Sequence, residues 1–261
     1  MNHFILTRFN VRVAYADPET RLDPAWLHHR FELFDRFCYP SVRNQSNHNF
    51  RWLVLFDSDT PHVFKEKIAK YARWNIFIPV YMDASNGERR RITQQEIMNH
   101  MSCGVQRVVT TRLDNDDALH SRFVQTLQDI TSSMNEDEVA FINFTRGYIW
   151  HDSKLYLTEQ ESNPFISMVE KAHDFQTVYC GVEHARLFTV APIREVLIAP
   201  LWLQVIHEKN VSNRVQGLRR PITALRGFKI DNATPTQNDW LSCWIERGRD
   251  TLKRNIRRLV R

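Results

Sequence analysis

The sequence predicts an α/β domain with a mostly parallel sheet in its N-terminal half, mixed strands in its C-terminal half and a basic amphipathic helix at the end. Three observations support this. Apolar runs typical of buried strands alternate with helical segments up to residue 118. Short strand-like segments then predominate. The content of 43% hydrophobic and 25% charged residues is that of an ordinary globular protein.

The first 118 residues are expected to alternate between strands and helices. Strands are expected at residues 4–9, 51–56, 76–81 and 107–113. The first helix has Asp23 as its N-cap and ends before Pro40, the second begins at Pro61, and the third covers 92–103. This alternation implies parallel pairing with right-handed crossovers.

The remaining residues are expected to form mixed, partly antiparallel structure. A helix should begin at Ala118 and extend to about residue 134, followed by strands at 139–145, 148–150 and 155–157. Further along, we expect a helix from Pro164, strand-like segments at 177–180 and 186–190, and then a helical stretch broken at Pro200. No repeat or linker divides the chain.

Glycine and cysteine exclude several kinds of site. The seven glycines are too far apart for a Rossmann or P-loop phosphate motif. The four cysteines stand singly without zinc spacing, which predicts reduced thiols in a cytoplasmic protein. No apolar run approaches the ~20 residues that span a bilayer.

The sequence Asp114-Asn115-Asp116-Asp117 directly follows the fourth expected strand. Open parallel sheets bind ligands at this edge, and Asp114 and Asp116 can face one cation together. Carboxylate oxygens favour Mg²⁺ or Mn²⁺. The alternative is a turn that caps a helix beginning at Ala118, with Asp117 as the capping residue. A cap needs one carboxylate, and two more would add repulsion, so metal or nucleotide binding is favoured.

The chain resembles a bacterial rhamnosyltransferase family, which belongs to the family-2-like glycosyltransferases with the GT-A fold. The acidic motif resembles the D-x-D of these enzymes, and Ser41 and Gln45 fit their S-x-x-x-Q pattern. Similar segments, over about residues 3–217, are 7–10, 40–45, 50–57, 111–119, 143–148, 163–170 and 202–213. The resemblance implies a nucleotide-sugar half (1–118) and an acceptor half (119–235) of one domain, before the helix at 236–261.

The resemblance also implies roles for individual residues. Asp57 would meet the nucleobase, Arg8 the base or phosphates, and Asp114 and Asp116 the ribose and metal. His207 would complete the metal site, although a histidine here could instead be a helix cap or a packed residue. Arg112 would contact phosphate or merely neutralise the acidic motif. The candidate nucleotide-sugar contacts are therefore Thr7, Arg8, Asp57, Arg112, Asp114 and Asp117.

An inverting transferase also needs a group that takes the proton of the acceptor hydroxyl. The chain lacks the clear acidic pair of related enzymes, so the base stays open among Glu170, Glu183, His184 and Glu208. Trp150, Trp202, Tyr148 and Tyr179 could stack on sugar rings, but large aromatic residues more often lie in the core.

The positive charge lies at the C-terminus. Residues 246–261 contain seven basic and two acidic residues. Their net charge of +5 equals that of the whole chain. With its apolar positions at helical spacing, this segment could contact an anionic membrane or dock on the domain. A peripheral position at the inner membrane surface is one expectation, whereas no nucleic-acid partner is expected.

The leading hypothesis is a metal-dependent glycosyltransferase. By family likeness, it would move rhamnose from dTDP-rhamnose to a saccharide or lipid-linked acceptor of a surface polysaccharide. One alternative is a metal-dependent phosphohydrolase or nuclease, because D-x-D-D also suits two-metal chemistry. Another is a non-catalytic binder of membrane or nucleic acid through the basic tail. Oligomeric state is left open.

Overall fold

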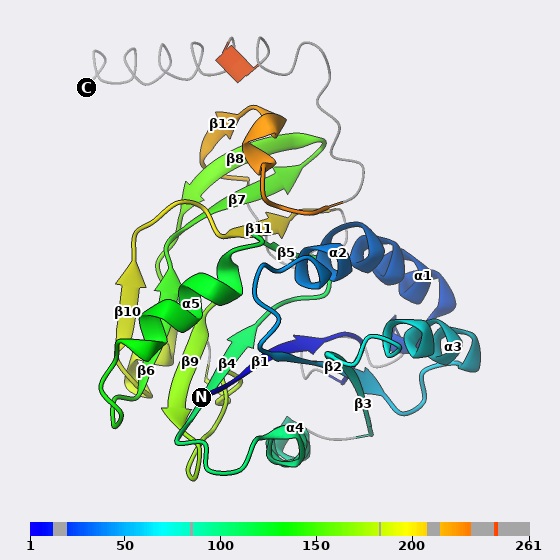
Figure 1. Cartoon of the computed structure of the whole chain (residues 1–261). Coiled ribbons are helices and arrows are strands. Elements are labelled where there is room, and N and C mark those ends of the chain that lie inside the picture. Colours follow the sequence, from blue (N-terminus) through cyan, green and yellow to red (C-terminus); the bar gives the residue numbers. More distant parts are fainter. Residues whose placement is uncertain (13–19, 84–85, 183, 208–214, 231–242, 245–261) are drawn as a thin grey trace.

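The computed structural model describes residues 1–12, 20–83, 86–182, 184–207, 215–230 and 243–244. These residues form a central sheet, a smaller second sheet, and helices packed on both faces of the central sheet (Figure 1). The expected α/β fold, parallel in the first half and mixed in the second, is confirmed.

The central sheet has six strands running in one direction and one running against them. Its order is β10 (Ile193–Val196), β6 (Ala140–Phe144), β9 (Ser167–Lys171), β4 (Arg107–Arg112), β1 (Asn2–Arg8), β2 (Arg51–Asp57) and β3 (Phe77–Met82). Only β9 is antiparallel to its neighbours in this sheet. The other six strands therefore have their carboxyl ends at one edge, and strands from both halves of the chain build it.

Alternate residues of the strands pack against helices on opposite faces of the sheet. One face contacts α1 (Pro24–Leu33), α3 (His62–Tyr71) and α5 (Phe123–Ser132), and the other contacts α4 (Asn86–His100). Ile5 belongs to the first core and Leu6 to the second, as the period of two in a strand requires. The strands of the first half were predicted because both of their faces are apolar.

The first helix begins where it was predicted and continues beyond its predicted end. Asp23 accepts a hydrogen bond from the backbone N–H of Trp26 at 2.7 Å, as an N-cap does. Pro40 does not stop the helix: a π-helical segment (Phe34–Cys38) follows α1 and leads into α2 (Tyr39–Arg43). The wider π turn lets the Tyr39 N–H bond to the Phe34 carbonyl, and Pro40, which has no N–H, lies within the first two positions of α2.

The second sheet packs over a smaller core. Its order is β12 (Leu218–Arg220), β8 (Lys154–Glu159), β7 (Arg146–His151), β11 (Trp202–Val205) and β5 (Ala118–Leu119). Trp202 pairs with Gly147 across β11 and β7, and its ring occupies the space above that glycine. A Cβ atom on Gly147 would lie 2.0 Å from the Trp202 ring.

Several predicted elements in the second half are wrong. Residues 118–119 form β5 rather than the start of a helix, and the helix expected from Pro164 is β9. The stretch around Pro200, expected to be helical, contains β10 before the proline and β11 after it. The strand-like run at 186–190 lies mostly in a 3-10 helix (His184–Thr189), and residues 177–180 form no strand. The strands at 139–145, 148–150 and 155–157 are confirmed with shifted ends as β6, β7 and β8.

The predicted C-terminal helix at 236–261 lies outside the described residues except for Cys243 and Trp244. The domain boundary at residue 235 falls in the same region and stays a prediction. Among the described helices, none is both long and apolar enough to cross a membrane.

Candidate active site

The acidic loop, Asp114 to Asp117, follows the end of β4. It lies at the edge of the sheet where β1 also has its carboxyl end. The backbone N–H of Leu113 donates to the carbonyl of Leu6 at 3.1 Å, which extends the pairing of β4 with β1. The Asn115 side-chain amide donates to the Phe9 carbonyl at 3.1 Å. The loop is therefore fastened to the end of β1, and the acidic side chains are placed at the predicted edge.

Asp116 is the centre of the loop's contacts. One of its oxygens, Oδ2, lies 2.6 Å from Nη1 of Arg30 and 2.9 Å from Nε2 of His207. Asp116 is 7% exposed, so water screens these contacts little. Arg30 comes from α1 and His207 from the residues after β11, so three distant parts of the chain meet at one carboxylate oxygen.

The position of His207 follows from β11 and α1. The Asp117 carboxylate accepts a hydrogen bond from the Val205 N–H at 2.8 Å, which attaches the acidic loop to the end of β11. The ring of His29 packs edge-on against the ring of His207, with 5.3 Å between centroids. The predicted proximity of His207 to the acidic motif is thus present, whereas metal ligation stays a prediction. Asp117 is not a helix cap, because β5 follows it.

The carboxylates of the acidic loop are close enough to repel one another. Burial, reinforced by the carboxylates of Asp116 and Asp114, raises the pKa of Asp117 well above its ordinary value. The Val205 N–H and Arg112 oppose this rise in pKa. Burial and the same three carboxylates also raise the pKa of the Cys38 thiol. A group that brings positive charge to this loop would relieve the repulsion.

Two arginines lie beside the loop at the ends of β1 and β4. Arg112 forms an ion pair with Asp114, with 2.9 Å between Nη2 and Oδ2. The Arg8 guanidinium lies over the ring of Tyr179, 4.6 Å from its centroid, and the Tyr179 hydroxyl donates to the Leu6 carbonyl at 3.2 Å. The Tyr179 pKa is raised by burial and lowered by Arg8 and Arg112. These cations lie at the edge of the sheet where an anionic ligand would meet the acidic loop.

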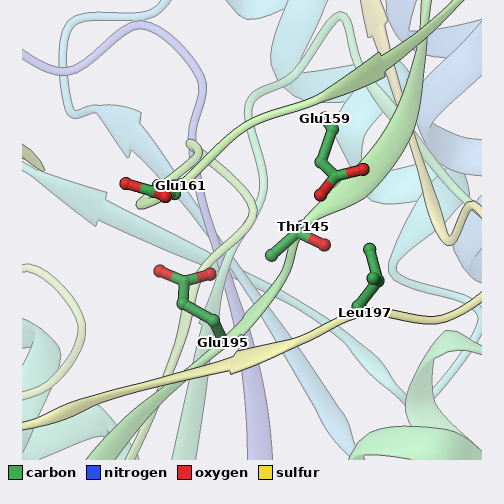
Figure 2. A pocket seen from close by; sticks show the side chains of 5 residues that line it. All are labelled: Thr145, Glu159, Glu161, Glu195 and Leu197. Carbon is green, nitrogen blue, oxygen red and sulfur yellow. The ribbon is translucent and has the colours of Figure 1, made fainter.

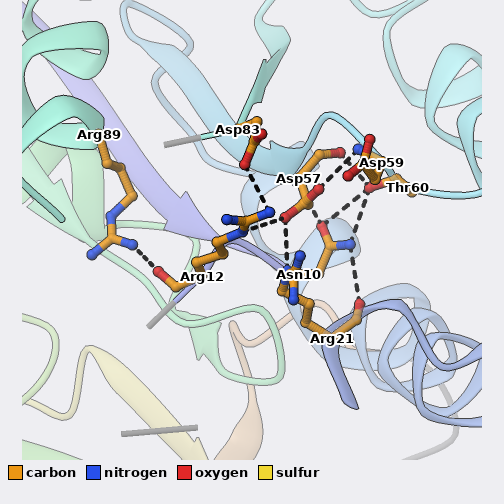
Figure 3. Close-up of polar contacts among 8 residues, drawn as sticks. All are labelled: Asn10, Arg12, Arg21, Asp57, Asp59, Thr60, Asp83 and Arg89. Atoms are coloured by element: carbon orange, nitrogen blue, oxygen red, sulfur yellow. Dashed lines mark hydrogen bonds and ion pairs between the residues drawn. The ribbon is translucent and has the colours of Figure 1, made fainter. Parts of the chain in front are cut away.

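Asp57, at the end of β2, is fully buried in a separate polar network (Figure 3). Its Oδ2 lies 2.7 Å from Nε of Arg21 and 4.0 Å from Nε of Arg12. Its Oδ1 accepts the Asp59 N–H at 2.8 Å, and its own N–H donates to the Asn10 side chain at 3.1 Å. The structure thus places Asp57 at the predicted edge, with two arginines beside it.

The other predicted contacts and base candidates are more scattered. Thr7 is fully buried, and its hydroxyl accepts a hydrogen bond from the Trp52 indole at 2.9 Å. Glu170 lies opposite Val108 in β4, roughly 20 Å along the strand from Asp114 at about 3.3 Å per residue. Burial raises the pKa of Glu170, whose carboxylate accepts the N–H groups of residues 176 and 177. The structure does not bring this candidate base to the acidic loop.

The three remaining base candidates are Glu183, His184 and Glu208. Glu183 and Glu208 lie outside the described residues, and His184 begins the 3-10 helix between β9 and β10. Their assignment as the base stays a prediction.

The described side chains have the chemistry of a metal site but not a complete cage. Within the described ranges, no three His, Cys, Asp or Glu side chains are grouped closely enough to hold a metal ion alone. Asp116 and His207 nevertheless offer a carboxylate oxygen and an imidazole nitrogen 2.9 Å apart. Mg²⁺ is usually bound by one or two carboxylates together with substrate phosphates. The residues therefore fit a cation that shares its ligands with a diphosphate.

Comparison with known families matches the chain to one of them. The model of the putative rhamnosyl transferase family matches residues 8–219, which include Arg8, Asp57, the acidic loop and His207. The chain belongs to this rhamnosyl transferase family. No curated protein matches it at significant similarity.

Several solved structures are also similar to this rhamnosyl transferase family member. The first is TarS of S. aureus, with 12% identity over 78% of this chain and 60% of the TarS chain, at a TM-score of 0.45. A second is TarS in complex with UDP, at 13% identity, 79% and 61% coverage and a TM-score of 0.43. A nucleotide-diphospho-sugar transferase of Desulfovibrio desulfuricans shows 12% identity, 80% and 83% coverage and a TM-score of 0.40. This chain spans about 60% of the length of the first of these TarS chains.

The sequence did not reveal three arginines that pair with site carboxylates in this family member, Arg12, Arg21 and Arg30. Arg30 stands in the run His28-His29-Arg30, a polar interruption of an otherwise apolar helix. That interruption was the available signal, because a polar side chain on a packed helix needs a partner. Arg21 had no comparable signal.

The candidate sugar-stacking residues are mostly core residues. Trp202 is fully buried, stacks on Phe165 and donates its indole N–H to the Phe144 carbonyl at 2.7 Å. Trp150 and Tyr148 are buried in the core of the second sheet. Tyr179 differs, because its ring supports Arg8 at the edge of the sheet.

An acidic pocket lies at the same edge, beyond β6 and β10 (Figure 2). It has a volume of about 620 Å³ and is lined by Thr145, Glu159, Glu161, Glu195 and Leu197. Glu195 accepts hydrogen bonds from the Asn143 side chain at 2.5 Å and the Ser162 N–H at 3.4 Å. Since β6 and β4 point the same way, the pocket is a second acidic surface along the edge that holds Asp114.

Proposed function

We propose that this protein transfers a sugar from a nucleotide-sugar donor bound at the carboxyl edge of the central sheet. The observation that supports this most directly is the contact of Asp116 with His207 at 2.9 Å, in a loop whose Asp114 pairs with Arg112. This site combines a carboxylate and an imidazole, which can bind a metal, with arginine side chains that suit phosphate. Membership in the rhamnosyl transferase family supports the same function.

The donor would lie across the ends of β1, β2 and β4. Asp57 would contact the nucleobase, with Arg21 and Arg12 fixing its carboxylate, and Arg8 and Arg112 would contact the phosphates. Tyr179 would hold Arg8 in place through its ring. The family suggests dTDP-rhamnose as the donor and a saccharide or lipid-linked acceptor of a surface polysaccharide.

Asp116 and His207 would hold Mg²⁺ or Mn²⁺, with Asp114 contacting the ribose or the metal. The bound cation would neutralise the negative charge that develops on the departing nucleoside diphosphate. Asp117 would keep the ligands together by joining the loop to β11. An inverting course with a general base is part of this proposal, as is peripheral membrane contact through residues 246–261, which lie outside the described residues.

A panel of nucleotide sugars, each assayed with Mn²⁺, Mg²⁺ or EDTA, tests this proposal. Donor-dependent transfer or hydrolysis should require the metal and fall at least about 100-fold in Asp116→Asn, because a metal ligand is lost. Asp137→Asn is the matched control, because this carboxylate pairs with Lys171 near the opposite edge. Full activity in Asp116→Asn, metal-independent turnover, or hydrolysis of simple phosphodiesters with no nucleotide sugar consumed would contradict the proposal.

A further inference from the structure

Arg30 has an unexpected position for a site that should bind a divalent cation. Its Nη1 lies 2.6 Å from the same Asp116 oxygen that His207 contacts, and 3.4 Å from the Asn115 side-chain oxygen. The Arg30 side chain is 18% exposed and that of Asp116 10%. A guanidinium therefore already neutralises the carboxylate that the metal would use.

The position of Arg30 is set by α1 and not by Asp116 alone. Its guanidinium lies 5.2 Å from the centroid of the Trp26 ring, one turn earlier in the helix. Its Nε is buried and has no hydrogen-bond partner within the described part of the chain. Arg30 thus keeps one N–H group without a hydrogen-bond partner among the described residues, and arginine binds phosphate through two parallel N–H groups.

A divalent cation and Arg30 would compete for Asp116. Two cations beside one mostly buried carboxylate repel each other, and the low local dielectric strengthens that repulsion. A diphosphate that arrives with the metal removes the conflict, because it offers Arg30 a new anionic partner within the same site. The metal alone offers Arg30 nothing in exchange.

We propose that Arg30 couples metal binding to donor binding: it is the counter-ion of Asp116 when the donor is absent and contacts the donor's diphosphate when it is present. The inference rests on the proposed function. Its consequence is that the metal binds weakly to the free protein and tightly together with a nucleoside diphosphate. Thermodynamic linkage requires the metal to strengthen diphosphate binding by the same factor.

The test is a binding cycle measured by calorimetry. The affinities of Mn²⁺ alone, of dTDP or UDP alone, and of each in the presence of the other are determined for the intact chain. Arg30→Gln should bind Mn²⁺ alone about tenfold more tightly and the nucleoside diphosphate about tenfold more weakly, so the coupling factor falls. Arg30→Lys keeps the charge, so its affinity for Mn²⁺ alone should stay near that of the parent protein.

Arg43→Gln is the matched control, because Arg43 lies at the end of α2 with its guanidinium over the Trp74 ring. Thermal unfolding with and without Mn²⁺ provides a second readout: the ion should stabilise Arg30→Gln more than the parent protein. Weaker or unchanged Mn²⁺ binding in Arg30→Gln, or a coupling factor equal to that of Arg43→Gln, would overturn the role of Arg30. If the parent protein binds no Mn²⁺ with either nucleotide, or if Asp116→Asn binds it equally well, the proposed function itself fails.

Discussion

Asp117 accepts a hydrogen bond from the Val205 backbone N–H, and this bond joins the acidic loop to the strand that leads to His207. Asp117 is the most deeply enclosed carboxylate of the motif, at 4% exposure. Its role in the described structure is to attach two segments that are 88 residues apart. The neighbouring Asp116 is then free to face Arg30 and His207.

Replacing Asp117 by Asn or by Ala separates the hydrogen bond from the charge. Both variants remove the titratable carboxyl group, but only Asn keeps an oxygen that can accept the Val205 N–H. We expect Asp117→Asn to have a free energy of unfolding about 1–3 kcal/mol greater than that of Asp117→Ala, because the alanine leaves a buried donor unsatisfied. Urea denaturation of the two variants measures the difference, and equal stabilities would refute this role.

His3 should make the protein sensitive to acid. Burial lowers the His3 pKa from 6.5 to about 3, while its ring contacts Thr111 at 2.8 Å. The unfolded chain therefore binds a proton between pH 6.5 and 3 that the folded chain does not, and stability falls as pH decreases through this window. The slope can reach about 1.4 kcal/mol per pH unit.

The contribution of His3 to the pH dependence of stability should disappear in His3→Gln. It should remain in His62→Gln, which alters an exposed histidine. Urea denaturation from pH 7 to pH 4.5 tests this prediction. An unchanged pH dependence in His3→Gln would show that His3 is not the responsible group.

The contact between Gly147 and Trp202 predicts a large cost for one methyl group. A Cβ on Gly147 would overlap the Trp202 ring, so Gly147→Ala should lose about 1–3 kcal/mol or more of stability. Adding the alanine to Trp202→Leu should cost much less, because the smaller side chain leaves space. The four proteins form a double-mutant cycle in urea, and strictly additive costs would argue against the contact.

Asp57 should determine nucleobase affinity. Asp57→Asn loses the charge that pairs with Arg21. We expect the affinity for dTDP and UDP to fall about tenfold, so that these two nucleotides bind with less advantage over ADP and GDP. Asp83→Asn removes an exposed carboxylate that pairs with Arg12 and serves as the control. Fluorescence titration with the four nucleotides measures both effects. A uniform loss for all four bases would point to a structural role instead.

The central strands and the acidic loop were predictable, because their signal is local. The strands β1, β2 and β4 are apolar on both faces, and the acidic residues follow β4 directly in the sequence. By contrast, β9 and β11 are short segments of five and four residues that mix apolar and polar side chains, and periodicity cannot separate strand from helix over so few residues. Their strand conformation depends on neighbours that are distant in sequence.

The site residues divide in the same way. His207 was proposed from a resemblance, and its contact with Asp116 exists only because β11 is a strand anchored by Asp117. The partners of Arg30 and Arg21 could not be assigned from sequence, because Arg30 meets Asp116 across 86 residues and Arg21 meets Asp57 across 36 residues. Local patterns place carboxylates at a strand end but do not identify their counter-ions.

The π-helical segment before Pro40 fixes a spacing as well as a shape. Upstream of it, Arg30 contacts Asp116, and downstream of it the Ser41 hydroxyl accepts the N–H of Leu119 in β5 at 3.1 Å, so the two ends of this helical region hold the acidic loop and the strand that follows it. If the same number of residues formed regular α-helix, one end would turn by about 100° relative to the other, because a π turn takes up one residue more than an α turn. Both contacts could then no longer form at once, so the extra residue of the π turn is what keeps Arg30 and Ser41 in phase, and a relative with a one-residue gap here should keep both contacts on a regular α-helix.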